Sequence, residues 1–301
     1  MADLHWVNRA YMEMWADMSR PLKGSFKDSP YVWKYDFATG KIKNKDPKKI
    51  ANKPANYYLL ENTKGEAVHN HLEQQLGKIE GEFLSIIRKK ISAQAPLDDN
   101  ERLVIATFIS LAVNRKPKQI ERFTGFVNDI LNEWVMPSLA KQIRNKNYSD
   151  AELESLRAGY KKETGLDISI EEMREGCKNI DHSHVSVELT KNRKLMTAFG
   201  VNIDRWAKFI MKHHWLFLRG EHFITGDLNS FAFFPLTPNV CMTLMIDEPG
   251  INWVELPENE LKEVNIKIFN SCDTFSIAKN REILDELKIK KQIYEKREAE
   301  H

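Results

Sequence analysis

Two acidic residues on one predicted helix have the spacing of a catalytic or metal-binding pair. Glu73 and Glu80 lie seven residues apart, which places them on the same helical face. Leu76 and Phe83 share that face, so both carboxylates border the apolar stripe. There they could point into a cleft and bind a metal ion or act as a general base. The alternative is an ordinary solvated surface, with ion pairs to neighbouring lysines.

A third acidic group follows an apolar pair late in the chain, in the stretch His222–Asn229. We expect Phe223 and Ile224 to belong to a buried strand that ends in a polar loop, with Asp227 at the mouth of a cleft. A side chain at the end of a buried strand is held in position by the scaffold, as a functional site requires. His222 enters the same strand and is a further candidate, although a histidine at a strand edge is more often a surface residue.

Arg115 ends a stretch, Leu103–Val113, that is apolar nearly all round. A cation at a helix C-terminus is stabilised by the helix dipole by about 0.3–1 kcal/mol, which is a sufficient structural reason for an arginine there. The same position would also let the guanidinium meet an anionic substrate or the Glu73 carboxylate. His5, in an opening segment rich in aromatic residues and methionine, is a candidate for proton transfer.

These candidates need a scaffold, and the hydrophobic periodicity predicts an α+β fold. It has a mostly helical body, a small antiparallel sheet in the last third and an N-terminal hairpin around Thr39 and Gly40. We expect one domain over residues 1–301, with residues 141–192 as a peripheral helical insertion or lid. The predicted helices cover residues 5–15, 69–95, 98–114, 117–136 and 195–210, with two short helices after Ser149 and Ser169 and a pair after Pro257. The predicted strands cover residues 215–218, 222–225, 231–234 and 240–246.

Composition and missing motifs narrow the function classes. The net charge of +2 over 301 residues gives no general field for nucleic acid. The three cysteines are far apart and form no Cys-x-x-Cys pair, which argues against a zinc ribbon or a disulfide framework. Dinucleotide-binding, P-loop and serine-hydrolase motifs are missing from the sequence. We expect no secretion signal, because Asp3 and His5 stand where a basic start would be, and no membrane span, and hence a cytoplasmic protein.

Several short motifs occur in an order that is familiar. They are His5-Trp-Val-Asn-Arg-x-Tyr11, Leu72-Glu73 with Ile79-Glu80, Arg115-Lys-Pro117, Phe223-Ile-Thr-Gly-Asp227, Phe234-Pro-Leu-Thr-Pro238 and Val264-Asn265. This order resembles the bacterial domain-of-unknown-function family 4238. Its members open with His-Tyr-Val-Pro and carry Phe-Ile-Thr-Ser-Asp-Asn-Pro before Pro-Leu-Ser-Pro.

The resemblance implies a bacterial or phage-borne cytoplasmic protein and no established activity. Some positions depart from the family pattern: Trp6, Asn8, Gly226 and Leu228 replace tyrosine, proline, serine and asparagine. Asn229 would have to take the role of the asparagine that Leu228 replaces. The resemblance draws attention to His5, Glu73, Glu80, Arg115 and Asp227 as one set, because they coincide with motif positions.

Two functions fit these residues. The first is a metal-dependent hydrolase acting on phosphodiester bonds of nucleic acid or a nucleotide. Glu73, Glu80 and Asp227 would bind Mg²⁺ or Mn²⁺, Arg115 would stabilise developing charge, and His5 or His222 would move a proton.

The second is a non-catalytic binding or regulatory module with a protein partner, for example a component of a phage-defence or toxin system. In that case the polar set would be a buried network that fixes the helical body against the sheet. A weaker third possibility is a small-molecule pocket roofed by Trp206, Trp215 and Phe233.

Overall fold

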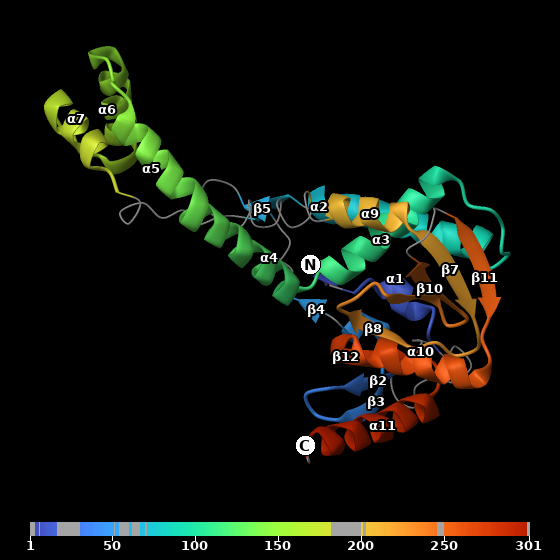
Figure 1. Cartoon of the computed structure of the whole chain (residues 1–301). Coiled ribbons are helices and arrows are strands. Elements are labelled where there is room, and N and C mark those ends of the chain that lie inside the picture. The colour runs from blue at the N-terminus through green and yellow to red at the C-terminus, as the bar shows by residue number, and fades with distance from the viewer. Residues whose placement is uncertain are drawn as a thin grey trace. The chain divides into compact units, whose positions relative to one another are not determined.

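The chain folds into two compact units, residues 1–120 with 191–301 and residues 121–190. The structure, a computed structural model, describes residues 4–5, 7–16, 31–50, 52–53, 60–61, 67–69, 71–181, 200, 203–245 and 250–299 (Figure 1). The single-domain organisation and the 141–192 insertion stay predictions.

The larger unit contains two four-stranded sheets. The first has the order β11-β7-β10-β9, formed by β11 (Ile251–Glu255), β7 (His214–Arg219), β10 (Val240–Met245) and β9 (Phe233–Thr237). The second has the order β3-β2-β12-β8, formed by β3 (Lys41–Lys45), β2 (Val32–Asp36), β12 (Cys272–Ala278) and β8 (Thr225–Leu228). Neighbouring strands are antiparallel except β11 and β7, which are parallel.

Two short antiparallel pairs and a set of helices complete the described elements. The pairs are β1 (Leu4–His5) with β4 (Asn52–Lys53), and β5 (Leu60–Glu61) with β6 (Ala67–His69). The helices of the larger unit are α1 (Arg9–Glu13), the 3-10 turn η1 (Pro47–Lys49), α2 (His71–Ile86) with the π-turn η2 (Ile87–Ile91), α3 (Asp99–Asn114), α9 (Ile203–Lys212), α10 (Glu258–Asn270) and α11 (Arg281–Ala299). The α+β prediction and the N-terminal hairpin, formed by β2 and β3, are confirmed.

The smaller unit is helical. It contains most of α4 (Pro117–Ile130), the π-turn η3 (Leu131–Val135), α5 (Met136–Asn145), α6 (Asp150–Thr164) and α7 (Ile170–Asn179). The prediction that Pro137 ends a helix is wrong. The π-turn comes just before this proline, which then occupies the first turn of α5, where a missing backbone N–H is tolerated.

Local capping signals predicted the helix starts correctly. Asp98 and Glu101 form a reciprocal capping box at α3, and Ser149 with Glu152 does the same at α6. Helix α3 packs against α2 and α9 and reaches β8, as its nearly all-round apolar surface predicts. Within the described residues, no helix combines the length and the apolar character needed to cross a bilayer.

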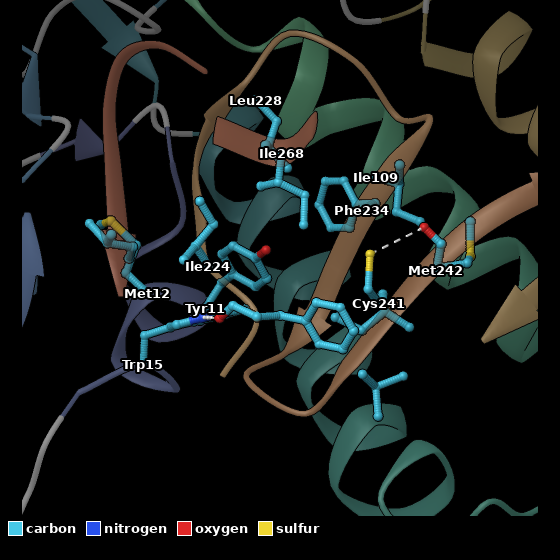
Figure 2. Packing of buried hydrophobic residues seen from close by; sticks show 14 of the residues in the cluster. Tyr11, Met12, Trp15, Ile109, Ile224, Leu228, Phe234, Cys241, Met242 and Ile268 are labelled. Carbon is cyan, nitrogen blue, oxygen red and sulfur yellow. Dashed lines mark hydrogen bonds between the residues drawn. The ribbon is translucent and has the colours of Figure 1, made fainter. Parts of the chain in front are cut away.

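One hydrophobic core joins α1, α2, α3 and the inner faces of both sheets. The ring of Tyr11 lies in this core with Trp15, Ile224 and Phe234, as Figure 2 shows. The opening segment is therefore a short helix packed on the body, as predicted. Its residues Tyr11, Met12 and Trp15 are at most 2 % exposed.

One expectation about the strands is wrong, and two strands of the four-stranded sheets were not predicted. The strand predicted at residues 222–225 lies further along, at Thr225–Leu228, so Asp227 is inside a strand and not in a loop at the mouth of a cleft. All four residues of β8 are buried. No sequence pattern predicts β11, and none predicts β12. Strand β12 is a central strand with four consecutive buried residues, 275–278, so its side chains do not alternate between apolar and polar.

Candidate functional site

The carboxylate of Asp227 is held by the neighbouring strand. Asp227 is 1 % exposed. The backbone N–H of Thr274 donates to its two oxygens at 3.0 and 2.9 Å, and the N–H of Phe275 donates to Oδ1 at 3.0 Å. The register between β8 and β12 shifts at this point, between Cys272 and Ser276. The side chain thus supplies acceptors for amides where the ladder is interrupted.

Thr225 and Gly226, the two residues before Asp227, are also buried in β8, and their contacts explain why. The hydroxyls of Thr225 and Tyr11 lie 2.7 Å apart and share a hydrogen bond, and Tyr11 also donates to the carbonyl of Pro235. Gly226 allows close approach of β12, since a Cβ there would lie 2.3 Å from the carbonyl oxygen of Phe275. Each polar group therefore has a partner, as burial requires.

Lys116 connects the end of the long buried helix to this strand pair. It follows Arg115, the C-cap of α3, and is 3 % exposed. Its Nζ donates to the backbone carbonyl of Asp227 and to Oδ2 of Asp273, both at 2.8 Å. Oδ1 of Asp273 accepts a hydrogen bond of 3.1 Å from Asn229 Nδ2. One buried ammonium group thus bridges the helical body, β8 and β12.

Arg115 takes part in a second ion pair of the helical body. Its Nη1 lies 2.6 Å from Oε1 of Glu80 on α2, and the Arg115 side chain is 5 % exposed. The pair joins α2 to the end of α3. We expected Arg115 to meet a carboxylate such as Glu73, and its partner in the structure is Glu80 of the same helix.

The electrostatic surroundings of the two aspartates differ. Burial raises the pKa of the Asp227 carboxyl above its ordinary value, although the amides of Phe275 and Thr274 and the charge of Lys116 act in the opposite direction. Burial also opposes ionisation of Asp273, but the hydrogen bond and charge of Lys116 outweigh it and lower the Asp273 pKa. Asp273 is therefore the charged partner of Lys116.

The sequence model of DUF4238, a family described as proteins of unknown function, matches residues 5–282 of this chain. The chain belongs to the DUF4238 family. Neither the curated proteins nor the solved structures contain a match to the chain. Membership of DUF4238 thus assigns no activity to the chain, and a function can be argued only from the geometry of the site.

Glu80 and Asp227, two of the residues predicted for the DUF4238 site, have separate partners. Glu80 pairs with Arg115, and Asp227 binds the amides of β12. Glu73 lies in α2 and His5 in β1, but their side chains fall outside the described part of the structure. Among the side chains that the structure does describe, no group of three or more histidine, cysteine, aspartate or glutamate residues could hold a metal ion. The predicted trio of Glu73, Glu80 and Asp227 stays a prediction.

Sequence reasoning missed two residues of this network, Lys116 and Asp273. Lys116 had a weak signal, its place beside Arg115 at the end of a buried helix, where a lysine stem can lie along apolar surface although the ammonium group usually stays in water. Asp273 had none, since β12 was not predicted. Asn229 donates a hydrogen bond to Asp273, and the suggestion that it replaces the residue after Asp227 stays a prediction.

His222 lies at a different place from Asp227, beside a cavity. Its φ of 72° is in the left-handed region that non-glycine residues seldom adopt. Asn265 of α10 holds this turn, because its Nδ2 donates to the His222 carbonyl at 3.1 Å and its Oδ1 accepts from the Ile224 N–H at 3.0 Å. The His222 side chain is 41 % exposed and lines a hollow of about 450 Å³ between α10 and α11. Such strained positions cluster at functional sites.

Proposed function

We propose that this DUF4238 protein acts by binding and not by catalysis at Asp227. The observation that carries the proposal is the position of the Asp227 carboxylate, which is 1 % exposed and accepts three hydrogen bonds from the backbone of β12. A carboxylate in this position serves to join two strands. Both of its oxygens already have donors, which leaves little capacity or access for a metal ion.

The other polar contacts support the same interpretation. Lys116 fixes the end of α3 to β8 and β12, and Arg115 fixes it to α2 through Glu80. Together they make the buried network that attaches the helical body to the second sheet. The binding surface is then elsewhere, and the cavity beside His222, at about 450 Å³, has the size of a small-ligand site.

The substitution Asp227→Asn tests this function. One carboxylate oxygen becomes an amide nitrogen that faces the Thr274 N–H donor, so we expect a loss of about 1–3 kcal/mol in the free energy of unfolding. The matched control is Asp204→Asn, which changes an exposed aspartate paired with Lys208 and should cost less than about 0.5 kcal/mol. Urea unfolding measures both.

Calorimetric titration with Mn²⁺ decides between this proposal and the hydrolase. We expect the same heat from wild type and Asp227→Asn, since Asp227 is not a metal ligand in our account. The contrary result is stoichiometric Mn²⁺ binding that Asp227→Asn abolishes, with an unfolding free energy within about 0.5 kcal/mol of wild type. That result would favour the metal-dependent phosphodiester hydrolase.

A further inference from the structure

The cavity between α10 and α11 has an apolar floor. Four aliphatic side chains line it: Leu256, Leu261, Ile283 and Leu287. They come from the end of β11 and from the two helices, which both pack on the second sheet. The volume of about 450 Å³ lies within the range of pockets for small organic molecules. The floor would bury the hydrocarbon part of such a ligand.

The rim of the cavity is acidic. Its lining carboxylates are Glu221, Glu258 and Glu286, and its lining ammonium groups are Lys262 and Lys290. Lys262 Nζ lies 2.7 Å from Glu258 Oε1, and each of these two residues shifts the pKa of the other toward the charged form. Lys290 Nζ lies 3.9 Å from Oε1 of a fourth carboxylate, Glu263. The residues that line the cavity thus contribute three carboxylates and two ammonium groups, so the rim carries a net negative charge.

The nature of the lining also restricts the kind of cation. Quaternary ammonium groups are usually held by faces of aromatic rings, and the described residues that line this cavity include no phenylalanine, tyrosine or tryptophan. Carboxylates instead suit a cation that donates hydrogen bonds, because charge-assisted hydrogen bonds are the strong ones. A primary amine fits this rim better than a quaternary amine.

We propose that this cavity binds a small primary amine, with its ammonium group at the carboxylates of the rim and its apolar body on the aliphatic floor. The proposal rests on the proposed binding function and specifies the ligand class. The turn at His222 forms one wall of the site. Asn265, 5 % exposed, holds the wall in place through its hydrogen bonds to the His222 carbonyl and the Ile224 amide.

Three probes with the same apolar body test the proposal on the full chain. They are 4-phenylbutylamine, 4-phenylbutan-1-ol and 4-phenylbutyrate, and isothermal titration calorimetry measures their affinities. We expect the amine to bind about tenfold more tightly than the alcohol and the carboxylate to bind least, with the advantage of the amine shrinking as salt is added. Equal affinities, a preference for the carboxylate, or no saturable binding of the amine up to about 1 mM would each overturn the proposal.

A pair of variants on α11 locates the site. Glu286→Gln removes a rim carboxylate and should weaken amine binding by about threefold to tenfold while leaving the alcohol unchanged. Glu282→Gln removes an exposed carboxylate of the same helix that does not line the cavity, and should leave both affinities unchanged. Equal effects of the two variants on the amine would place its binding elsewhere. These readouts do not involve Asp227, so their failure would leave the Mn²⁺ and stability tests standing.

Discussion

Replacing Lys116 by methionine should detach the end of α3 from the second sheet. The Lys116 side chain is 4 % exposed, and its ammonium group has two acceptors at 2.8 Å, the Asp227 carbonyl and the Asp273 carboxylate. Methionine keeps most of the apolar stem but leaves both acceptors without this donor. Removing one partner of a buried ion pair costs about 3–5 kcal/mol, and we expect a loss of this size in the free energy of unfolding.

A double-mutant cycle with Asp273→Asn separates this bridge from general disruption. The Asp273 side chain is 26 % exposed, so its single substitution should cost less than that of Lys116. We expect a coupling energy of about 1–3 kcal/mol between the two positions. Urea unfolding followed by tryptophan fluorescence measures it, since Trp15 and Trp215 are fully buried in the larger unit.

The matched control for the cycle is the exposed pair of α9, Lys208 and Asp204, whose side chains are 69 % and 61 % exposed. Lys208→Met should lower the free energy of unfolding by less than about 0.5 kcal/mol, and the coupling energy between Lys208 and Asp204 should also be below about 0.5 kcal/mol. The reasoning is refuted if Lys116→Met stays within about 0.5 kcal/mol of wild type, or if the effects at Lys116 and Asp273 add within about 0.3–0.5 kcal/mol.

Two further predictions concern the same strands. Gly226→Ala should reduce the yield of folded protein or lower the melting temperature sharply, because the added Cβ would clash with the β12 backbone. The control is Gly81→Ala in α2, which has open space around it and should be neutral or stabilising by up to about 1 kcal/mol. Thermal unfolding followed by circular dichroism compares the two variants. Lys116 lowers the Asp273 pKa, so the stability that Asp273 contributes should be complete above about pH 4 and be lost as the pH falls through its folded-state pKa. A stability difference between wild type and Asp273→Asn that grows on acidification would contradict this sign.

The sequence predicts those parts of the fold that depend on neighbours in the chain. Asp98 and Ser149 each start a helix with a glutamate three residues later, and the structure contains both capping boxes. The stretch 103–113 is apolar nearly all round and predicts a buried helix, because a helix with apolar residues on most faces has to be covered by its neighbours. Thr39 and Gly40 predict the hairpin turn, where Gly40 has a φ of 61°.

The environment of Asp227 could not be predicted, because it depends on contacts distant in sequence. Its hydrogen-bond donors lie 47 and 48 residues later, and the Lys116 amine lies 111 residues earlier. The pattern before it suggested a strand followed by a loop, since polar residues usually mark the end of a strand. They are buried here because Tyr11, Lys116 and the backbone of β12 satisfy them.

The most direct test of the central claim is an amide NMR spectrum of the full chain during titration with paramagnetic Mn²⁺. If the Asp227 carboxylate joins β8 to β12, the amide signals of Thr274 and Phe275 should keep their intensity relative to buried amides elsewhere. Selective loss of these two signals at low Mn²⁺ would place the metal at Asp227 and contradict the account.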